Sequence, residues 1–290
     1  MASIIITGTS SGIGMETALA LGRAGHRVFA TMRNPGAART LGETVKKEKL
    51  KVSIHVMNVD SDASVKSAME EIRSATGGVI DVLVNNAGIE RRGSVEELPL
   101  EEFRAVMETN YFGAIRCIKE VIGGMRARGS GCIINVASVA GKISAAPLTA
   151  YSASKFALEA LSEGLAQEVK AFGIRVAIVE PGIIDTPMAR AIEEEPDASA
   201  YPQGKRFSGI YTASLKSPAP PSLVGDAIRE IVESGTWKLR HPVGPDAAAF
   251  LGWRAAMNDE EWVDWGALED DAWYARVQSD FGLDARPRGK

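Results

Sequence analysis

The chain has 290 residues, 45% of them hydrophobic and 24% charged, and is long enough to bury one large core without disulfides or a metal. Its formal net charge of -4 argues against a nucleic-acid partner, because phosphate binding needs an excess of Lys and Arg. The two cysteines and three histidines are too scattered for a metal site, so we expect no metal. The N-terminus has no basic leader and no long apolar stretch, so we expect a cytoplasmic protein without a membrane span.

Short β-branched apolar runs alternate with longer amphipathic runs as far as about position 242. This alternation predicts an α/β fold, a doubly wound Rossmann-type parallel sheet of seven strands with helices on both faces, in the order 3-2-1-4-5-6-7. We expect strands near 3–7, 27–32, 52–57, 80–85, 131–137, 174–180 and 237–242. We expect helices near 12–25, 36–48, 61–76, 101–127, 150–172 and 222–234.

Two segments interrupt this alternation. Residues 186–221 are polar and rich in proline, and we expect them to form a lid within a single Rossmann-fold domain of residues 1–244. Residues 245–290 carry four tryptophans and predict a helical extension of one or two helices packed on that domain. Other interpretations stay open: the lid segment could simply cover the sheet edge, and the extension could shape a pocket, contact a second subunit or only pack on its own domain.

A glycine-rich turn follows the first strand and precedes a helix, in the sequence Thr7-Gly8-Thr9-Ser10-Ser11-Gly12-Ile13-Gly14. Glycines permit the turn and let backbone N–H groups and the helix N-terminus face a pyrophosphate. Glycines also occur in simple turns, but the position directly after the first strand favours a dinucleotide site.

The end of the second strand indicates which dinucleotide would bind. An acidic side chain there would hydrogen-bond the two ribose hydroxyls of NAD, but this chain has Met32 followed by Arg33. A guanidinium group suits a 2′-phosphate, so we expect NADP(H) rather than NAD(H). The alternative is that Arg33 is an ordinary solvated loop residue.

Tyr151 and Lys155 lie four residues apart at the start of a predicted helix, and therefore one turn from each other on one face. A neighbouring ammonium group would lower the pKa of a phenol toward neutral pH, which makes Tyr151 a candidate acid/base. Ser138 ends the fifth strand at the carboxyl edge of the sheet, where it could hold a substrate oxygen. Alone, the Tyr and Lys pair would more often be a surface helix pair.

Taken together, these residues resemble the short-chain dehydrogenase/reductase family over about residues 3–242. The matching motifs are Thr7-Gly8-x3-Gly12-Ile13-Gly14, Asn85-Asn86-Ala87-Gly88, Asn110, Ser138, Tyr151-x3-Lys155 and Pro181-Gly182-x3-Thr186. The residues Val28–Asn34 and Pro242–Ala247 look like the hydroxysteroid and retinol dehydrogenase branch.

The resemblance implies roles for residues of these motifs. Asn86, beside Ala87 and Gly88, and the pair Asn58-Val59 would lie near adenine and its ribose. After Pro181 and Gly182, Ile184 and Thr186 would hold the nicotinamide carboxamide. Lys155, beside Tyr151, would also bind the nicotinamide ribose, and Asn110 would anchor a water that links Lys155 to solvent. Asn58 stands where many members carry Asp, and its side-chain oxygen can still accept a hydrogen bond.

We therefore expect an oxidoreductase that transfers a hydride between NADP(H) and a small-molecule carbonyl compound or alcohol. The apolar residues of the lid suggest a lipophilic ketone or secondary alcohol. Apolar residues on more than one face of the helices at 101–127 and 150–172 suggest a homodimer or homotetramer, although they could be core contacts. The alternatives are a nucleotide sensor or regulatory protein without turnover, which the intact Ser138, Tyr151, Lys155 and Asn110 disfavour, and an epimerase or dehydratase of the same family.

Overall fold

The computed structural model describes residues 1–192 and 199–287. Within these ranges all the strands pair in parallel in one sheet of seven, and the order β3-β2-β1-β4-β5-β6-β7 confirms the expected topology. The strands are β1 (Ser3–Thr7), β2 (Arg27–Met32), β3 (Val52–Val56), β4 (Val82–Asn85), β5 (Gly131–Val136), β6 (Ile174–Pro181) and β7 (Arg240–Val243).

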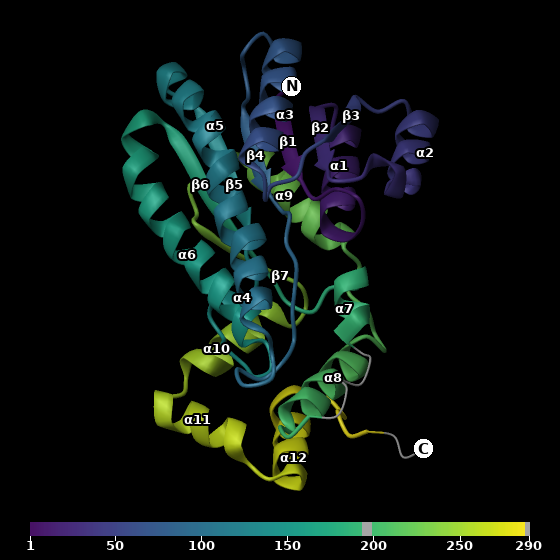
Figure 1. The fold of residues 1–290 in the computed structure, drawn as a ribbon, viewed down its shortest axis with the longest axis vertical. Helices are drawn as coiled ribbons and strands as arrows, with labels where there is room; N and C mark the ends of the chain where they lie inside the picture. The colour runs from purple at the N-terminus through teal and green to yellow at the C-terminus, as the bar shows by residue number, and fades with distance from the viewer. Residues whose placement is uncertain (193–198, 288–290) are drawn as a thin grey trace.

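Helices cover both faces of the sheet (Figure 1). One face packs against α1 (Gly12–Arg23), α2 (Arg39–Glu48) and α9 (Ser222–Ser234), and the other against α3 (Asp62–Thr76), α5 (Gly113–Arg128) and α6 (Thr149–Val169). Successive side chains of a strand point to opposite faces, so Ile4 and Ile6 of β1 join the first core whereas Ile5 joins the second. Because both faces are buried, the central strands are mostly apolar, and the buried Asn85 and Asn135 of β4 and β5 hydrogen-bond each other.

The expected helix at 101–127 is interrupted. The structure has α4 (Leu100–Met107), then a π-helical segment, Glu108–Phe112, then α5. A π-helical turn holds an extra residue and distorts the backbone ladder locally, and this one contains Asn110, whose side chain is buried. The sequence has no proline between positions 101 and 127 that would mark the interruption, which is why it predicts one unbroken helix.

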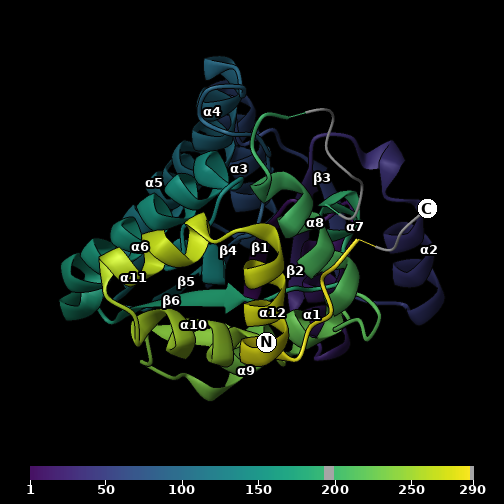
Figure 2. The same ribbon diagram turned by 90° about the horizontal axis from the view of Figure 1, so that it is seen from below.

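The lid and the C-terminal segment are both helical, and the two views place them together at one end of the sheet (Figures 1 and 2). The lid contains α7 (Pro187–Ile192) and α8 (Gln203–Ser214), and residues 193–198 of this segment lie outside the described residues. The extension forms α10 (Ala247–Ala255), α11 (Asp259–Ala267) and α12 (Asp270–Phe281), three helices where the sequence predicted one or two. Asn258 and Glu261 form a capping box that starts α11 as a separate helix.

The lid and the extension are joined by an ion pair and by aromatic packing. Arg206 of α8 is 4% exposed, and its Nε donates to Asp270 of α12 at 2.7 Å. The same guanidinium group lies 5.7 Å from the centroid of the Trp273 ring. The two segments are therefore held together over the carboxyl ends of the strands. No helix in the described part of the chain is long and apolar enough to cross a membrane.

Candidate active site

Loops at the carboxyl ends of the strands line a cavity of about 820 Å³. Every residue that the sequence analysis assigned to catalysis or cofactor binding lies in the wall of this cavity, apart from Asn110. The structure therefore brings together residues that are spread from Gly8 to Thr186 along the chain. This placement follows from the parallel sheet, whose strands all end at the same edge.

The glycine turn after β1 is shaped by close backbone contacts. Gly8 has φ +71°, and a Cβ atom there would lie 2.7 Å from Cα of Ala87. A Cβ atom on Gly14 would lie 2.3 Å from the carbonyl oxygen of Gly8. Glycine is thus required at both positions for the start of α1 to reach the loop that follows β4.

Thr7 and Asn86 hold the turn and the β4 loop together. Thr7 Oγ1 accepts hydrogen bonds at 2.9 Å from the backbone N–H groups of both Asn86 and Ala87. Asn86 Nδ2 donates to the carbonyl oxygens of Thr7 at 2.8 Å and of Gly8 at 3.0 Å. Besides lining the cavity, Asn86 therefore positions the glycine turn, a task that its sequence motif did not indicate.

The turn fits an anionic ligand. Ser11, the N-cap of α1, is extended with φ -164° and makes no side-chain cap hydrogen bond within the described structure. The first N–H groups of α1 are therefore not capped from that side chain, and such groups bind phosphate. Because the same turn lines the cavity and contributes the glycines Gly8, Gly12 and Gly14 to its wall, it fits a dinucleotide pyrophosphate.

The ends of β2 and β3 border the same part of the cavity. Arg33 follows β2 with an exposed side chain and lines the cavity. Asn58 follows β3, and its Oδ1 accepts a long hydrogen bond of 3.3 Å from the backbone of Asp60. Its own backbone N–H donates to Ser64 Oγ at 2.9 Å. The Asn58 side chain is thus oriented by a local turn that places it in the cavity wall.

Tyr151 and Ser138 both lie in the wall of the same cavity. Tyr151 is in the first turn of α6, and Ser138 follows β5, where its Oγ accepts from the backbone N–H of Ala140 at 3.1 Å. Burial raises the pKa of Tyr151 to about 12, and a hydrogen bond with Ser138 counteracts only part of this rise. The phenol is therefore protonated at neutral pH.

The effect of Lys155 on the pKa of Tyr151 differs from what the sequence analysis expected. It is 4% exposed, its Nζ donates to the carbonyl oxygen of Val136 at 2.9 Å, and the same atom lies 5.5 Å from the centroid of the Tyr151 ring. Burial lowers its own pKa to about 8, although Glu159 acts in the opposite direction. The sequence analysis expected Lys155 to lower the pKa of Tyr151. In the structure the desolvation of the phenol dominates instead.

Asn110 lies behind the cavity wall, in the π-helical segment. Its Oδ1 accepts from the N–H of Ile89 at 2.8 Å, and its Nδ2 donates to the carbonyl of Ile89 and to Ser154 Oγ, both at 2.9 Å. Ser154 Oγ in turn donates to the carbonyl of Tyr151 at 2.7 Å. Asn110 thus connects the β4 loop to α6 and lies beside the site. Its role as a water anchor stays a prediction.

The lid and the extension both contribute aromatic side chains to the cavity wall. The sequence analysis had left open whether these segments shape a pocket. Phe207 and Tyr211 of α8 line the cavity, and so do Trp253, Trp262 and Trp265 of the extension. The rings of Trp262 and Trp265 stack with centroids 5.3 Å apart. Tyr201 also belongs to the lid segment, but it is not in the wall, and its hydroxyl binds Glu96 on the surface.

The sequence analysis did not identify two acidic residues at or near the site, Asp246 and Glu90. Asp246 Oδ2 accepts from the backbone N–H of Ile183 at 2.9 Å and so holds the loop after β6. Glu90 lines the cavity two residues after Gly88, with a side chain that is only 10% exposed. Glu90 lies in none of the quoted motifs, and Asp246 lies in the Pro242–Ala247 segment without an assigned role, so only their burial and contacts reveal them.

The chain is similar to known short-chain dehydrogenases in both sequence and fold. A family model described as short chain dehydrogenase matches residues 2–197. Retinol dehydrogenase 8 of Bos taurus is 36% identical over 239 residues, which cover 80% of this chain and 75% of that protein.

Solved structures resemble most of the chain. A short-chain dehydrogenase from Streptomyces avermitilis has a TM-score of 0.76 and 33% identity, and the match covers 92% of this chain and 96% of that one. A variant of actinorhodin polyketide ketoreductase, solved with NADPH, has a TM-score of 0.75 and 30% identity, covering 85% and 97%.

We expect Gly14→Ala to destabilise the protein, because the added methyl group would meet the Gly8 carbonyl oxygen at 2.3 Å and Asn86 Nδ2 at 2.4 Å. Overpacking of this kind costs about 1–3 kcal/mol of unfolding free energy, which thermal or urea denaturation would measure. The matched control is Gly123→Ala in α5, where nothing lies within 4 Å and helix propensity favours Ala by about 0.5–1 kcal/mol. Equal stability of the two variants would contradict the tight packing of the turn.

Proposed function

We propose that this chain, which belongs to the short-chain dehydrogenase family near its retinol dehydrogenase-like members, interconverts a carbonyl compound and an alcohol with NADP(H). The observation that carries the proposal is the placement of Tyr151, Ser138 and Lys155 in one cavity wall, beside a glycine turn with uncapped helix N–H groups. The cavity thus combines a place for a dinucleotide with hydroxyl donors for a substrate oxygen.

The chain's own residues would hold the nucleotide along the carboxyl edge of the sheet. The turn from Gly8 to Gly14 would bind the pyrophosphate, Asn58 and Val59 the adenine end, and Ile184 and Thr186 the nicotinamide end. When bound, the nicotinamide supplies or accepts the hydride. The exposed Arg33 at the cavity rim supports NADP(H) over NAD(H), because a guanidinium group pairs with a 2′-phosphate.

In the reductive direction, negative charge develops on the substrate oxygen and the two hydroxyl groups donate to it. Tyr151 and Ser138 are held in place before the reaction, so no reorganisation of water opposes this stabilisation. Tyr151 completes the step by transferring its Oη proton to that oxygen. A phenol that burial keeps protonated suits this role as a general acid.

Lys155 would return a proton to the site after each reduction. Its pKa of about 8 lets Nζ release a proton more readily than an exposed lysine would. Its bond to the Val136 carbonyl fixes Nζ next to β5 and within one helical turn of Tyr151. Asn110 would support this path by holding the β4 loop against α6.

The aromatic part of the wall supports a lipophilic substrate. Eight aromatic side chains of the lid and the extension line the cavity that also contains the proposed acid: Phe207, Tyr211, Phe250, Trp253, Trp262, Trp265, Trp273 and Phe281. Burying apolar surface against such side chains contributes about 25 cal/mol per Å². We infer that the reacting ketone or secondary alcohol carries a bulky apolar group, and that residues 245–290 belong functionally to the main domain.

We also propose a homodimer or homotetramer in the cytoplasm. Most of the apolar residues that suggested an interface are core residues, such as Ile118 and Leu158, but Phe112 is 45% exposed and Phe156 is 41% exposed. Exposed aromatic rings near one helical surface support self-association. Two free, buried thiols, Cys117 and Cys132, suit a reducing compartment. Light scattering should give a dimer or tetramer mass, and a monomer would reject the interface.

We expect Tyr151→Phe to lower NADPH-dependent reduction of lipophilic ketones by about 10³-fold or more, because the general acid and one donor are lost together. Binding of NADPH, measured by its fluorescence, should change little. Tyr201→Phe is the matched control, since this tyrosine lies outside the cavity wall. Full activity of Tyr151→Phe would remove Tyr151 from its role, and absence of wild-type turnover over a broad ketone and aldehyde panel would favour the sensor.

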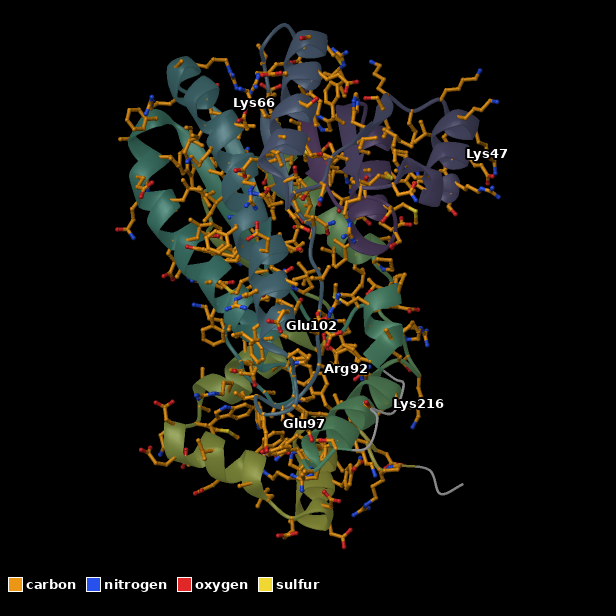
Figure 3. All side chains as sticks on the ribbon, viewed as in Figure 1. Lys47, Lys66, Arg92, Glu97, Glu102 and Lys216 are labelled. Carbon is orange, nitrogen blue, oxygen red and sulfur yellow. The ribbon has the colours of Figure 1, made fainter. Side chains whose placement is uncertain are left out.

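We expect Arg33→Ala to raise the KM for NADPH by about 10–100-fold and to leave the KM for NADH almost unchanged, because a charge-assisted contact is worth about 1.5–3 kcal/mol. Lys47→Ala, an exposed cation on α2, should change neither value (Figure 3). Steady-state kinetics with both nucleotides would measure this. Equal effects of Arg33→Ala on the two nucleotides would contradict NADP(H) selectivity.

A further inference from the structure

The lid helix α8 lies between the cavity and the C-terminal segment of the chain. Phe207 and Tyr211, four residues apart and therefore on one face of α8, line the cavity, and the centroids of their rings are 5.0 Å apart. Gly209, also in α8, does not line the cavity. A helix turns by about 100° per residue, which places Gly209 on the side of α8 opposite to Phe207.

The backbone of the C-terminal segment crosses α8 at this glycine. A Cβ atom on Gly209 would lie 2.1 Å from the carbonyl oxygen of Ala285 and 3.1 Å from its carbonyl carbon. Ala285 itself is only 2% exposed. Glycine inside a helix is unfavourable compared with alanine, so the close approach of the two backbones gives a physical reason for Gly209. Any side chain at this position would block the contact.

Residues 282–287, which we call the strap, are directed to α8 by the end of α12. Gly282 ends α12 in the left-handed conformation with φ +68°, so the chain turns away instead of continuing the helix. Both views show the chain leaving α12 and passing α8 (Figures 1 and 2). Leu283 and Ala285 of the strap pack in one apolar cluster with Ile210 of α8. The strap is thus held by apolar contacts on both sides of the crossing.

The strap adds a second contact to the one that Arg206 provides. Arg206, one turn before Gly209, binds Asp270 at the start of α12. The Asp270 side chain is 62% exposed, so solvent weakens this ion pair. A single contact also leaves α8 free to rotate about it, whereas two contacts one turn apart fix the orientation of the helix. That orientation decides where Phe207 and Tyr211 stand in the cavity wall.

We propose that the strap positions α8 as a wall of the substrate cavity, and that Gly209 and Ala285 are positioning residues that favour substrates with a bulky apolar group. The inference rests on the proposed function and names the contact that maintains its selectivity. Neither residue touches the substrate. When the strap is displaced, Phe207 and Tyr211 lose their fixed place and bury less surface of a bulky substrate. The nucleotide end of the cavity is formed by other loops and keeps its shape.

Two substitutions break the contact from its two sides. Gly209→Ala places a methyl group against the Ala285 carbonyl although it raises the helix propensity of α8, and Ala285→Asp places a carboxylate in a buried site. Hydrogen exchange of the α8 amides should become about 10-fold faster in both variants. Because both variants break one contact, the double variant should exchange no faster than the single ones. Gly252→Ala in α10 is the control, since a Cβ atom there has no described atom within 4 Å.

Binding of 2-acetylnaphthalene, a bulky aromatic methyl ketone, tests the selectivity. Quenching of tryptophan fluorescence can follow this binding in the protein saturated with NADP⁺. We expect its Kd to rise about 10-fold in Gly209→Ala and in Ala285→Asp, and to stay unchanged in Gly252→Ala. The Kd of NADPH should change little in all three variants. A general loss of structure would weaken both ligands, so this difference isolates the positioning of the substrate wall.

Unchanged exchange of α8, an unchanged ketone Kd, equal weakening of the ketone and NADPH, or no binding of the ketone by the wild-type protein would overturn the proposal. Both readouts are independent of turnover. Ketone binding that depends on the strap, without any NADPH oxidation, would leave the strap standing and contradict the proposed function. Turnover of this ketone with binding that does not depend on the strap would do the reverse.

Discussion

The desolvation of the partly buried Tyr151 beside the buried Lys155, at the edge where the strands of the sheet end, is the constraint on which the rest of the site depends. Desolvation disfavours the phenolate and also the ammonium group, so it moves the two pKa values apart, to about 12 for Tyr151 and about 8 for Lys155. The result is a phenol that holds its proton beside an amine that releases one readily. A pair exposed on a helix surface would have neither property.

Several backbone contacts hold this pair in place. Lys155 is tied to β5 through the Val136 carbonyl, and Asn110 ties the β4 loop to α6 through Ile89 and Ser154. Similar bonds join the glycine turn to the same loop. The proposed nucleotide site and the proposed acid therefore rest on one connected set of loops, and the lid and the extension close over it through the Arg206–Asp270 ion pair.

Much of this arrangement could be predicted from the sequence, because it depends on local signals. The apolar runs indicate the strands, and motif residues at strand ends must meet at one sheet edge. Features that depend on packing could not be predicted in this way. No proline marks the π-helical turn at Asn110, and Glu90 is one of 37 acidic residues in the chain, distinguished only by its burial. In the sequence, the tryptophans of the extension indicate that it packs through aromatic side chains, but they do not indicate which surface it covers.

The most direct test of the central claim is the ionisation of Tyr151 in the nucleotide-free protein. The ¹³Cζ resonances of labelled tyrosines can be followed against pH, with Tyr151→Phe identifying the signal. The buried environment implies that Tyr151 stays a phenol above about pH 10, the reference pKa of tyrosine. A phenolate formed at about pH 9 or below would show that Lys155, rather than burial, controls this group, and would contradict the account.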